Sequence, residues 1–351
     1  MLLHDVVAAF ATVRPFASFR DQPPATAVAR ASFVAVAAAC GAALTAFAPA
    51  AAAQDYPARP VHLVVSFVTG GPTDVIGRLL ATALADRLGQ NFVVENRGGA
   101  GGNIAARLVA AAPADGYTLL VTTSALAVNQ TLYRDPGYQL PRDFTPIALV
   151  AMSPNVFVVS PSSPAGTLAE FLRDSKGRQV TYATAGIGTT PHLSGDQLLR
   201  GLGGLDAQDV PFQGAAPAIA AVMGNHVTLG SVTFAPALAA IKGGKLKGLA
   251  ITSLQRADAL PDLPTVAESG FPGFESYTWV GVLGPANLPP AIVARLSATI
   301  NDVLSRSDVR ENLATLGFET RTGTPAEFDV YLRQEIVKWG KLLKQTSIAP
   351  Q

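Results

Sequence analysis

Two segments of the chain combine glycine and threonine in a way that suits anion binding. The first segment covers residues 67–74 (FVTGGPTD) and the second segment covers residues 184–192 (TAGIGTTPH). Glycine lets backbone N–H groups approach a ligand closely, threonine adds hydroxyl donors, and successive amides in such turns bind anions without a cationic side chain. Neither segment contains Lys or Arg. An anion bound there would therefore be neutralised by dipoles.

The motifs give little support for nucleotide binding, hydrolase chemistry or metal binding. The first segment lacks the GK[ST] of a Walker loop and the glycine spacing of a dinucleotide fingerprint, so a tight turn without a ligand is the alternative there. Ser194 does not lie in a G-x-S-x-G elbow, and the histidines at 62, 192 and 226 lack metal-ligand spacing. His192 is the obvious catalytic candidate, but a lone histidine at a helix start more often caps or packs. We predict a protein that is not an enzyme, with no metal and no cofactor.

The composition of the chain narrows the possible classes of protein further. The chain has 351 residues, 26 Lys+Arg against 25 Asp+Glu, and one cysteine. At roughly 150 residues per domain, two domains are expected. Near-neutral charge without a basic run argues against nucleic acid as a partner. A single cysteine excludes zinc-finger and iron–sulfur sites.

Residues 1–53 predict a cleaved secretory signal. Arginines precede an Ala-rich, uncharged stretch over 31–53 that ends in three alanines before Gln54, which is the pattern that signal peptidase recognises. A membrane anchor and lipidation at Cys40 are the alternatives. Cleavage would deliver a periplasmic protein and would remove three arginines and two aspartates, leaving 23 basic against 23 acidic residues.

Beyond residue 53, short apolar runs alternate with helical patterns, which predicts an α/β fold with a largely parallel sheet. Strands are expected at 61–65, 92–94, 117–121, 156–159, 180–183, 210–212, 227–231 and 246–252, and helices over 75–84 (ending at Gly89), 104–112 and in the C-terminal tail, the last over 325–346. Each glycine segment follows a strand and opens a helix, where ligands of α/β proteins bind. Thr73 is expected to cap its helix and Asp74 to complement the helix dipole. The glycine run 98–102 is expected to pack at the rim of the cleft.

The order of these motifs resembles that of the substrate-binding receptors of tripartite tricarboxylate transporters, the Bug receptor family. The resemblance runs from about Tyr56 to the C-terminus. The motifs that carry it are YPARPV (56–61), FVTGGPTD (67–74), ENRGGAGGN (95–103), DGYTL (115–119), AGIGTTPH (185–192), VPFQG (210–214) and ALPDLPTVAE (259–268). Several are weak alone, but in this order and spacing they are highly specific.

The resemblance implies a type II periplasmic binding protein fold, with two α/β lobes, a hinge and a ligand cleft between the lobes. The first lobe would comprise residues 54–154 and 278–351, and the second lobe residues 155–277. The implied function is that of a periplasmic, monomeric solute-binding receptor that captures a small carboxylate and delivers it to the membrane permease subunits of its transporter. A ligand-dependent signalling co-receptor for a membrane sensor, without transport, is the alternative.

The resemblance also implies which residues bind the ligand carboxylate. They are Gly70, Gly71, Thr73 and Asp74 in the first segment, and Gly186, Gly188, Thr189 and His192 in the second. Two departures from the family matter. Pro72 replaces a glycine and removes one amide donor, and Val232 stands where many relatives carry Asp. The second departure predicts a preference for carboxylates without an amino group, since an unpaired buried ammonium is costly.

Overall fold

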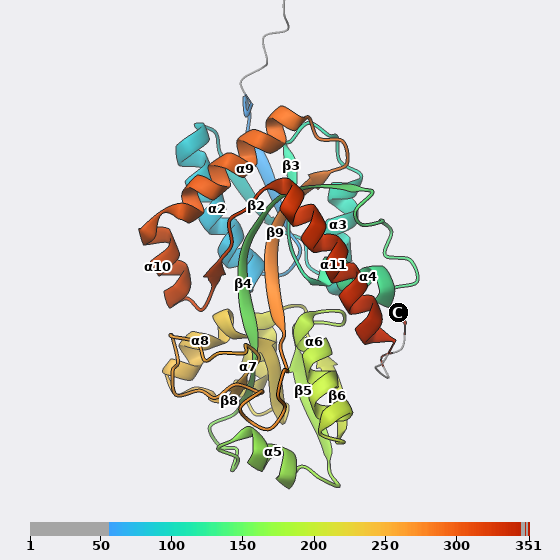
Figure 1. Ribbon diagram of the computed structural model, residues 1–351, viewed down its shortest axis with the longest axis vertical. Coiled ribbons are helices and arrows are strands. Elements are labelled where there is room, and N and C mark those ends of the chain that lie inside the picture. The colour runs from blue at the N-terminus through green and yellow to red at the C-terminus, as the bar shows by residue number, and fades with distance from the viewer. Residues whose placement is uncertain (1–55, 345–347, 349) are drawn as a thin grey trace, which may run out of the picture. The chain divides into compact units, whose positions relative to one another are not determined.

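The computed structural model describes residues 56–344, 348 and 350–351, and the predicted signal peptide lies outside these residues. The first sheet has the order β2-β1-β3-β9-β4, and the second consists of β4, β7, β5 and β6, with β8 on the other edge of β4 (Figure 1). The strands are β1 (Val61–Val65), β2 (Phe92–Asn96), β3 (Thr118–Thr123), β4 (Phe144–Val159), β5 (Gln179–Thr184), β6 (Asp206–Pro211), β7 (Leu229–Thr233), β8 (Lys247–Ile251), β9 (Tyr277–Pro285) and β10 (Glu319–Thr320). β1 pairs in parallel with β2 and β3, and β5 pairs in parallel with β6 and β7. We call the part built on the first sheet the first lobe and the part built on the second sheet the second lobe.

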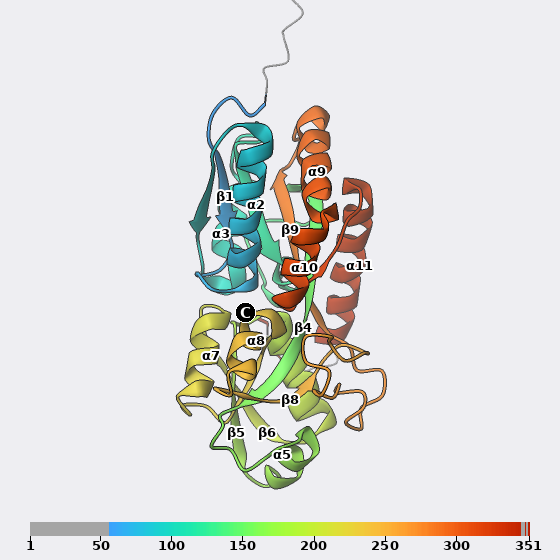
Figure 2. The same cartoon turned by 90° about the vertical axis from the view of Figure 1, so that its left-hand side faces the viewer.

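The long strand β4 belongs to both sheets. Its residues up to Pro154 pair antiparallel with β9, and from Asn155 on it pairs with β7 instead. Figure 2 shows β4 passing from the strands β1 and β9 to the strands β5, β6 and β8. The partner change between Pro154 and Asn155 is a natural place for a hinge. The lobe boundaries themselves stay a prediction.

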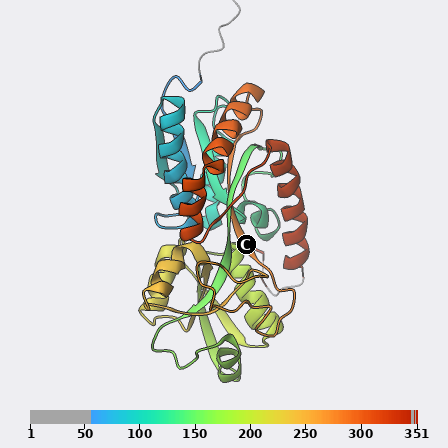
Figure 3. The same cartoon turned by 60° about the vertical axis from the view of Figure 1, so that its left-hand side comes forward.

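Helices cover both faces of each sheet. The first lobe contains α2 (Pro72–Leu88), η1 (Ala100–Gly102), α3 (Asn103–Ala110), α4 (Ala125–Leu132), α9 (Pro290–Ser305), α10 (Ser307–Thr315) and α11 (Pro325–Leu343). The second lobe contains α5 (Leu168–Asp174), α6 (Thr190–Gly195), the π-helical turn η2 (Asp196–Leu202), α7 (Ala215–Met223) and α8 (Phe234–Lys242). α11 lies apart from α9 and α10, on the other side of β4 (Figure 3).

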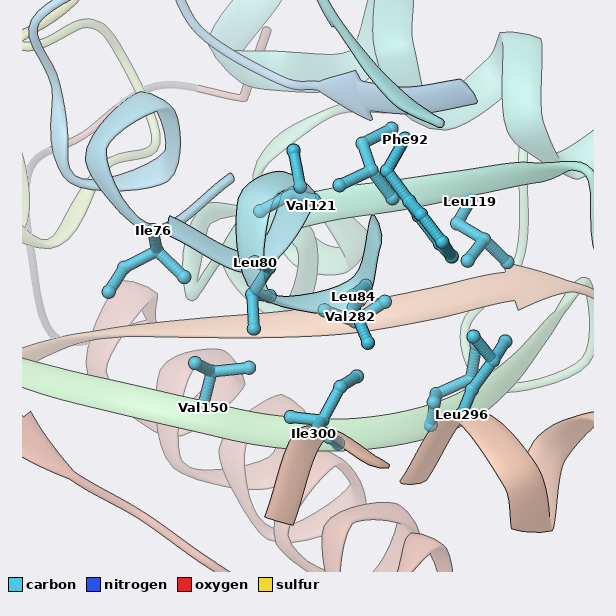
Figure 4. Close-up of a cluster of buried hydrophobic side chains, with 14 of the residues drawn as sticks. Ile76, Leu80, Leu84, Phe92, Leu119, Val121, Val150, Val282, Leu296 and Ile300 are labelled. Atoms are coloured by element: carbon cyan, nitrogen blue, oxygen red, sulfur yellow. The ribbon is translucent and has the colours of Figure 1, made fainter. Parts of the chain in front are cut away.

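Apolar packing against the sheets positions the loops. Leu80 of α2 and Ile300 of α9 are fully buried against the first sheet (Figure 4), and each such side chain contributes about 1.5–3 kcal/mol by leaving water. Trp279 of β9 packs under α11 on the opposite face, where its indole N–H donates to the buried Glu335 at 3.0 Å. These contacts fix the strand ends from which the glycine segments emerge.

Most expected elements are confirmed, with three corrections. The sheets are mixed rather than largely parallel, because β9 pairs antiparallel with β3 and β4, and β4 also pairs antiparallel with β7 and β8. Gly89 ends α2 in the left-handed conformation, at φ 70°. Thr73 does not cap α2: Pro72 occupies the first helical position, so Gly71 is the N-cap and Thr73 lies inside the helix. The strand expected at 156–159 is the end of the 16-residue β4. Its first half shows no clear periodicity because the pairing with β9 shifts register between Pro146 and Ala148 and again between Leu149 and Ala151. The last helix ends at Leu343, and its expected end at 346 lies outside the described residues.

Candidate ligand-binding site

The first segment, between β1 and α2, is organised around an ionised carboxylate. Asp74 accepts hydrogen bonds from the Gly70 amide and from Arg78 Nε, both at 3.0 Å. Burial opposes ionisation, but the hydrogen bonds from Arg78 and Gly70 hold the pKa of Asp74 below its ordinary value. Gly70 has φ +84°, which strains any residue with a Cβ. Asp74 therefore shapes the segment, and its charge is already paired.

The second segment, between β5 and α6, is closed by its own hydrogen bonds. The Thr189 hydroxyl donates to the Gly186 carbonyl at 2.7 Å, and the Gly188 amide donates to His192 Nδ1 at 3.3 Å. Gly186 and Gly188 have φ of +128° and +82°, so both positions favour glycine. The segment is thus preformed without any charged side chain of its own.

Two titratable groups lie beneath the second segment. Burial lowers the pKa of His192 to about 4 and raises the pKa of Asp209 to about 6. His192 is neutral at physiological pH, and because Nδ1 accepts from Gly188 its proton lies on Nε2, 3.8 Å from Asp209 Oδ2. Asp209 Oδ1 accepts from the Thr184 hydroxyl at 2.8 Å. The neutral imidazole accepts a hydrogen bond from the Gly188 amide and so helps to hold the turn.

A small cavity, which we call the threonine pocket, lies between the two segments. Its volume of about 20 Å³ suits one or two oxygen atoms of a ligand. It is lined by Phe67, Gly71, Pro72, Thr123, Ala185, Thr189, Thr190, Pro191, Ala215, Thr233 and Thr278. The lining offers five threonines and no ionisable side chain, so hydroxyl groups are its polar chemistry.

A second cavity of about 190 Å³, the outer cavity, shares Phe67 and Ala185 with the threonine pocket. Its remaining lining residues are Gly99, Ala100, Gly101, Tyr133, Gly186, Ile187, Pro211, Phe212 and Gln213. These residues come from both lobes. The surface of the threonine pocket is mainly apolar around its hydroxyl groups, while the outer cavity exposes polar and apolar surface in similar measure.

Glycines allow the two lobes to approach each other around these cavities. A Cβ at Gly101 would lie 2.6 Å from the Ile187 carbonyl oxygen, and one at Gly188 would lie 2.3 Å from Asn129 Oδ1. Glycine is therefore required at these crossing points. The expected place of the run 98–102 at the cleft rim is confirmed, since Gly99 and Gly101 line the outer cavity.

The predicted site residues fall into two groups. Gly71 and Thr189 line the threonine pocket and Gly186 lines the outer cavity, so the structure brings these three together. The other five belong to the same two segments but are not among the residues that line either cavity: Gly70, Thr73, Asp74, Gly188 and His192. Their contact with a ligand stays a prediction.

Sequence analysis missed four lining threonines. Thr123 ends β3 and Thr233 ends β7, so the rule that ligands bind at the carboxyl ends of strands would have found both. Thr190 lies within the second segment but was not singled out. Thr278 lies at the start of the antiparallel β9, and no sequence signal places it beside the others.

Val232 belongs to the core of the second lobe and lines neither cavity. Val232 is fully buried in an apolar cluster that includes Val156, while its neighbour Thr233 lines the threonine pocket. An aspartate at position 232 would therefore face the core. The case against an amino-acid ligand rests instead on the lining of the two cavities, which contains no acidic side chain.

A larger cavity of about 470 Å³ lies elsewhere, between residues 253–259 and 314–319. No residue of either segment lines it. Its lining includes Asp258, Glu275 and Glu319, and its one cation, Arg256, is paired with Glu268, so it is poorly suited to an anion. Within the described part of the chain, no group of three or more His, Cys, Asp or Glu side chains is placed to hold a metal ion. Among the described helices, none has both the length and the apolar character needed to cross a membrane.

Comparison with known proteins agrees with this architecture. The family model for the tripartite tricarboxylate transporter family receptor matches residues 76–348. The solved periplasmic binding protein BugD is 35% identical, with 84% of this chain and all of BugD covered at a TM-score of 0.80. A protein of R. palustris solved with adipate is also 35% identical, covering 84% of this chain and 100% of that one at a TM-score of 0.82.

MatC from Rhodopseudomonas palustris, solved with bound malate, is 34% identical to this chain. The match covers 82% of this chain and 100% of MatC, at a TM-score of 0.78. The expected periplasmic binding protein fold with two α/β lobes is therefore confirmed. The chain belongs to the tripartite tricarboxylate transporter receptor family.

Proposed function

We propose that this protein is a periplasmic receptor that binds a small carboxylate between its lobes and delivers it to the membrane permease of a tripartite tricarboxylate transporter. The observation that carries the proposal is the threonine pocket, where hydroxyl groups from both lobes converge between the two glycine segments. Solved relatives contain adipate and malate, which supports a carboxylate for this chain also.

The ligand carboxylate occupies the threonine pocket, and the rest of the ligand extends into the outer cavity. Hydroxyl groups that donate to a carboxylate form charge-assisted hydrogen bonds, which are about twice as strong as neutral ones. Tyr133 and Gln213 offer polar groups to the far end of the ligand, and Phe212 offers apolar contact. Because both lobes line the two cavities, a bound ligand favours the closed arrangement of the lobes.

A thermal-shift and calorimetry panel tests the binding step. The panel contains malate, succinate, adipate, citrate, benzoate, aspartate and glutamate. At 100 times its Kd, a true ligand stabilises the folded protein by about 2.7 kcal/mol. At least one carboxylate without an amino group should give such a shift, and aspartate and glutamate should give the smallest shifts. A largest shift with aspartate or glutamate would overturn the argument from the lining.

Delivery is tested in cells. Deletion of the gene should abolish uptake of the labelled carboxylate that binds best in the panel, and the wild-type gene should restore it. Uptake that persists while expression of a ligand-induced gene is lost would identify the signalling co-receptor instead.

The signal peptide is tested by intact mass. The periplasmic fraction should contain a chain that begins at or within a few residues of Gln54. A retained or acylated Cys40 would contradict this.

A further inference from the structure

Three buried threonine hydroxyls in the threonine pocket contact one another. They belong to Thr190 of α6, Thr233 of β7 and Thr278 of β9, which are 1%, 2% and 4% exposed. Thr278 Oγ1 forms hydrogen bonds with Thr190 Oγ1 and, at 3.3 Å, with Thr233 Oγ1. We call these three residues the hydroxyl cluster. Which oxygen donates each proton decides what kind of ligand group the cluster can bind.

Asn155, a fully buried residue at the point where β4 changes partner, sets the direction of these hydrogen bonds. Asn155 Nδ2 lies 3.1 Å from both Ser194 Oγ and Ser276 Oγ. The Ser194 proton is available to the Thr190 carbonyl or to Ser276 Oγ, each at 2.7 Å. In the structure both serine oxygens accept from Asn155, whose amide has Nδ2 toward the serines.

The amide oxygen of Asn155 then faces Thr278. Asn155 Oδ1 lies 2.9 Å from Thr278 Oγ1, and a carbonyl oxygen only accepts. Thr278 must donate its single proton to Asn155. Toward the threonine pocket, Thr278 is an acceptor alone, while Thr190 and Thr233 have protons to donate.

A carboxylate in the pocket changes the balance of donors. The Thr190 and Thr233 protons turn to the carboxylate, because charge-assisted hydrogen bonds are the stronger ones. The lone pairs of Thr278 Oγ1 then lose their donors, and an unpaired buried acceptor is unfavourable. A ligand that brings its own neutral donor restores the missing hydrogen bond.

We propose that the site selects carboxylates with a hydroxyl on the carbon next to the carboxylate, and that Thr278 Oγ1 accepts the proton of that hydroxyl. The inference rests on the proposed function. The hydroxyl must be adjacent to the carboxylate, because Thr278 Oγ1 is within hydrogen-bond distance of both Thr190 and Thr233. An ammonium group also donates, but the lining holds no acidic side chain to pair with it. A keto group would place its lone pairs against those of Thr278.

Calorimetry with matched ligands tests this selection. Malate, succinate and oxaloacetate share a four-carbon dicarboxylate frame and differ by one hydroxyl, hydrogen or keto group. Lactate with propionate, and citrate with tricarballylate, extend the comparison to smaller and larger ligands. In the series that binds, the hydroxy acid should bind about tenfold more tightly than the deoxy acid, as one neutral hydrogen bond to a buried acceptor allows. Oxaloacetate should bind no better than succinate.

Two variants assign the effect to Thr278. Thr278→Val keeps the shape of the side chain and removes the acceptor, so the ratio of the two Kd values should fall to within about twofold. Thr278→Ser keeps the hydroxyl and should retain most of the ratio. A change in stability alone would shift both Kd values together and leave the ratio unchanged. Circular dichroism and thermal melts check that each variant folds.

The possible outcomes separate the two proposals. If no carboxylate of any series binds, the proposed function fails. If the deoxy acids bind as tightly as the hydroxy acids, carboxylate capture stands and the hydroxyl selection is overturned, whether or not Thr278→Val folds. A wild-type ratio that persists in folded Thr278→Val also overturns the inference, since another group then recognises the hydroxyl.

Discussion

The two glycine segments occupy equivalent positions in the two lobes, each between a parallel strand and a helix. A charged side chain holds the first segment, whereas a neutral one holds the second. In the first segment, the ionised Asp74 accepts from Gly70 and Arg78. In the second, the neutral His192 accepts from Gly188, above an Asp209 whose pKa burial raises. A paired negative charge therefore holds the first turn, and a neutral ring holds the second. In both cases the lining itself stays uncharged.

The two segments also differ in the hydrogen bonding of a buried threonine. Thr189 donates to Gly186 at 2.7 Å and closes its own turn. Thr73 is fully buried, and its hydroxyl has no hydrogen-bond partner. The second segment is complete by itself, whereas the first contains an unused donor.

The largest effect should come from filling the space at Gly188. Gly188→Val places a Cβ 2.3 Å from Asn129 Oδ1 at a φ of +82°. The clash and the backbone strain together should weaken carboxylate binding about a hundredfold or more. Gly177→Val is the matched control, since Gly177 has φ +73° with nothing within 4 Å of its Cβ position. It should show the strain in a melting curve and leave affinity unchanged. Equal affinity in both variants would remove the second segment from the site.

The two aspartates should respond to pH with opposite signs. The folded-state pKa of Asp209 is raised to about 6, so its contribution to stability is present below pH 4 and is lost as pH rises through 6. Asp209→Asn should therefore be more stable than the wild type at pH 7, by about 1–3 kcal/mol, and equal to it near pH 4. The pKa of Asp74 is lowered, so its contribution is present above pH 4 and lost below.

Urea unfolding between pH 3 and pH 8 measures both effects. Asp74→Asn should be less stable than the wild type at pH 7, with the difference shrinking as the pH falls below 4. The folded-state pKa of His192 is lowered to about 4. Its contribution to stability is therefore lost as the pH falls from 6.5 to 4, in the wild type and in both variants. An Asp209→Asn variant that is less stable at pH 7 would show that the Thr184 hydrogen bond outweighs burial of the charge.

Substitutions of Thr73 and Thr189 should change the free energy of unfolding by smaller amounts and in opposite directions. Thr73→Val removes a buried hydroxyl without a partner and should raise the free energy of unfolding by up to about 1 kcal/mol. Thr189→Val breaks the hydrogen bond to Gly186 and should lower it by about the same amount. If the ligand recruits the Thr73 hydroxyl, Thr73→Val should also weaken binding about tenfold. Chemical denaturation and calorimetry on the two variants give these values. Equal destabilisation of both would mean that Thr73 already has a partner.

The smallest expected effect is that of salt. No Lys or Arg lines either cavity, so both segments should bind the carboxylate through dipoles. The Kd should change less than about threefold between 0.05 and 0.5 M NaCl, because only surface charges are screened. A steep loss of affinity with salt would indicate a cationic partner that the cavities do not contain.

The amino-acid sequence alone predicts the elements whose signals are local. Apolar runs place β1 and β5, Gly89 ends α2, and the glycine segments lie where α/β proteins bind ligands, because a turn after a strand needs residues that a sequence displays directly. The same local rules failed for Thr73, since Pro72 shifts the helix start by its own geometry. The length of β4 was underestimated because two register shifts in its first half interrupt the alternating pattern.

The tertiary structure alone decides which groups meet. Asn155 and Thr278 are 123 residues apart, and Thr190 and Thr278 are 88 apart, yet all three converge where β4 changes partner. No periodicity encodes such a contact, because sheet pairing depends on the packing of the whole molecule. The residues themselves indicate two glycine segments without Lys or Arg and the resemblance to a receptor family. The direction of the proton at Thr278 follows only from the folded chain, since a hydroxyl donates according to which acceptor lies beside it.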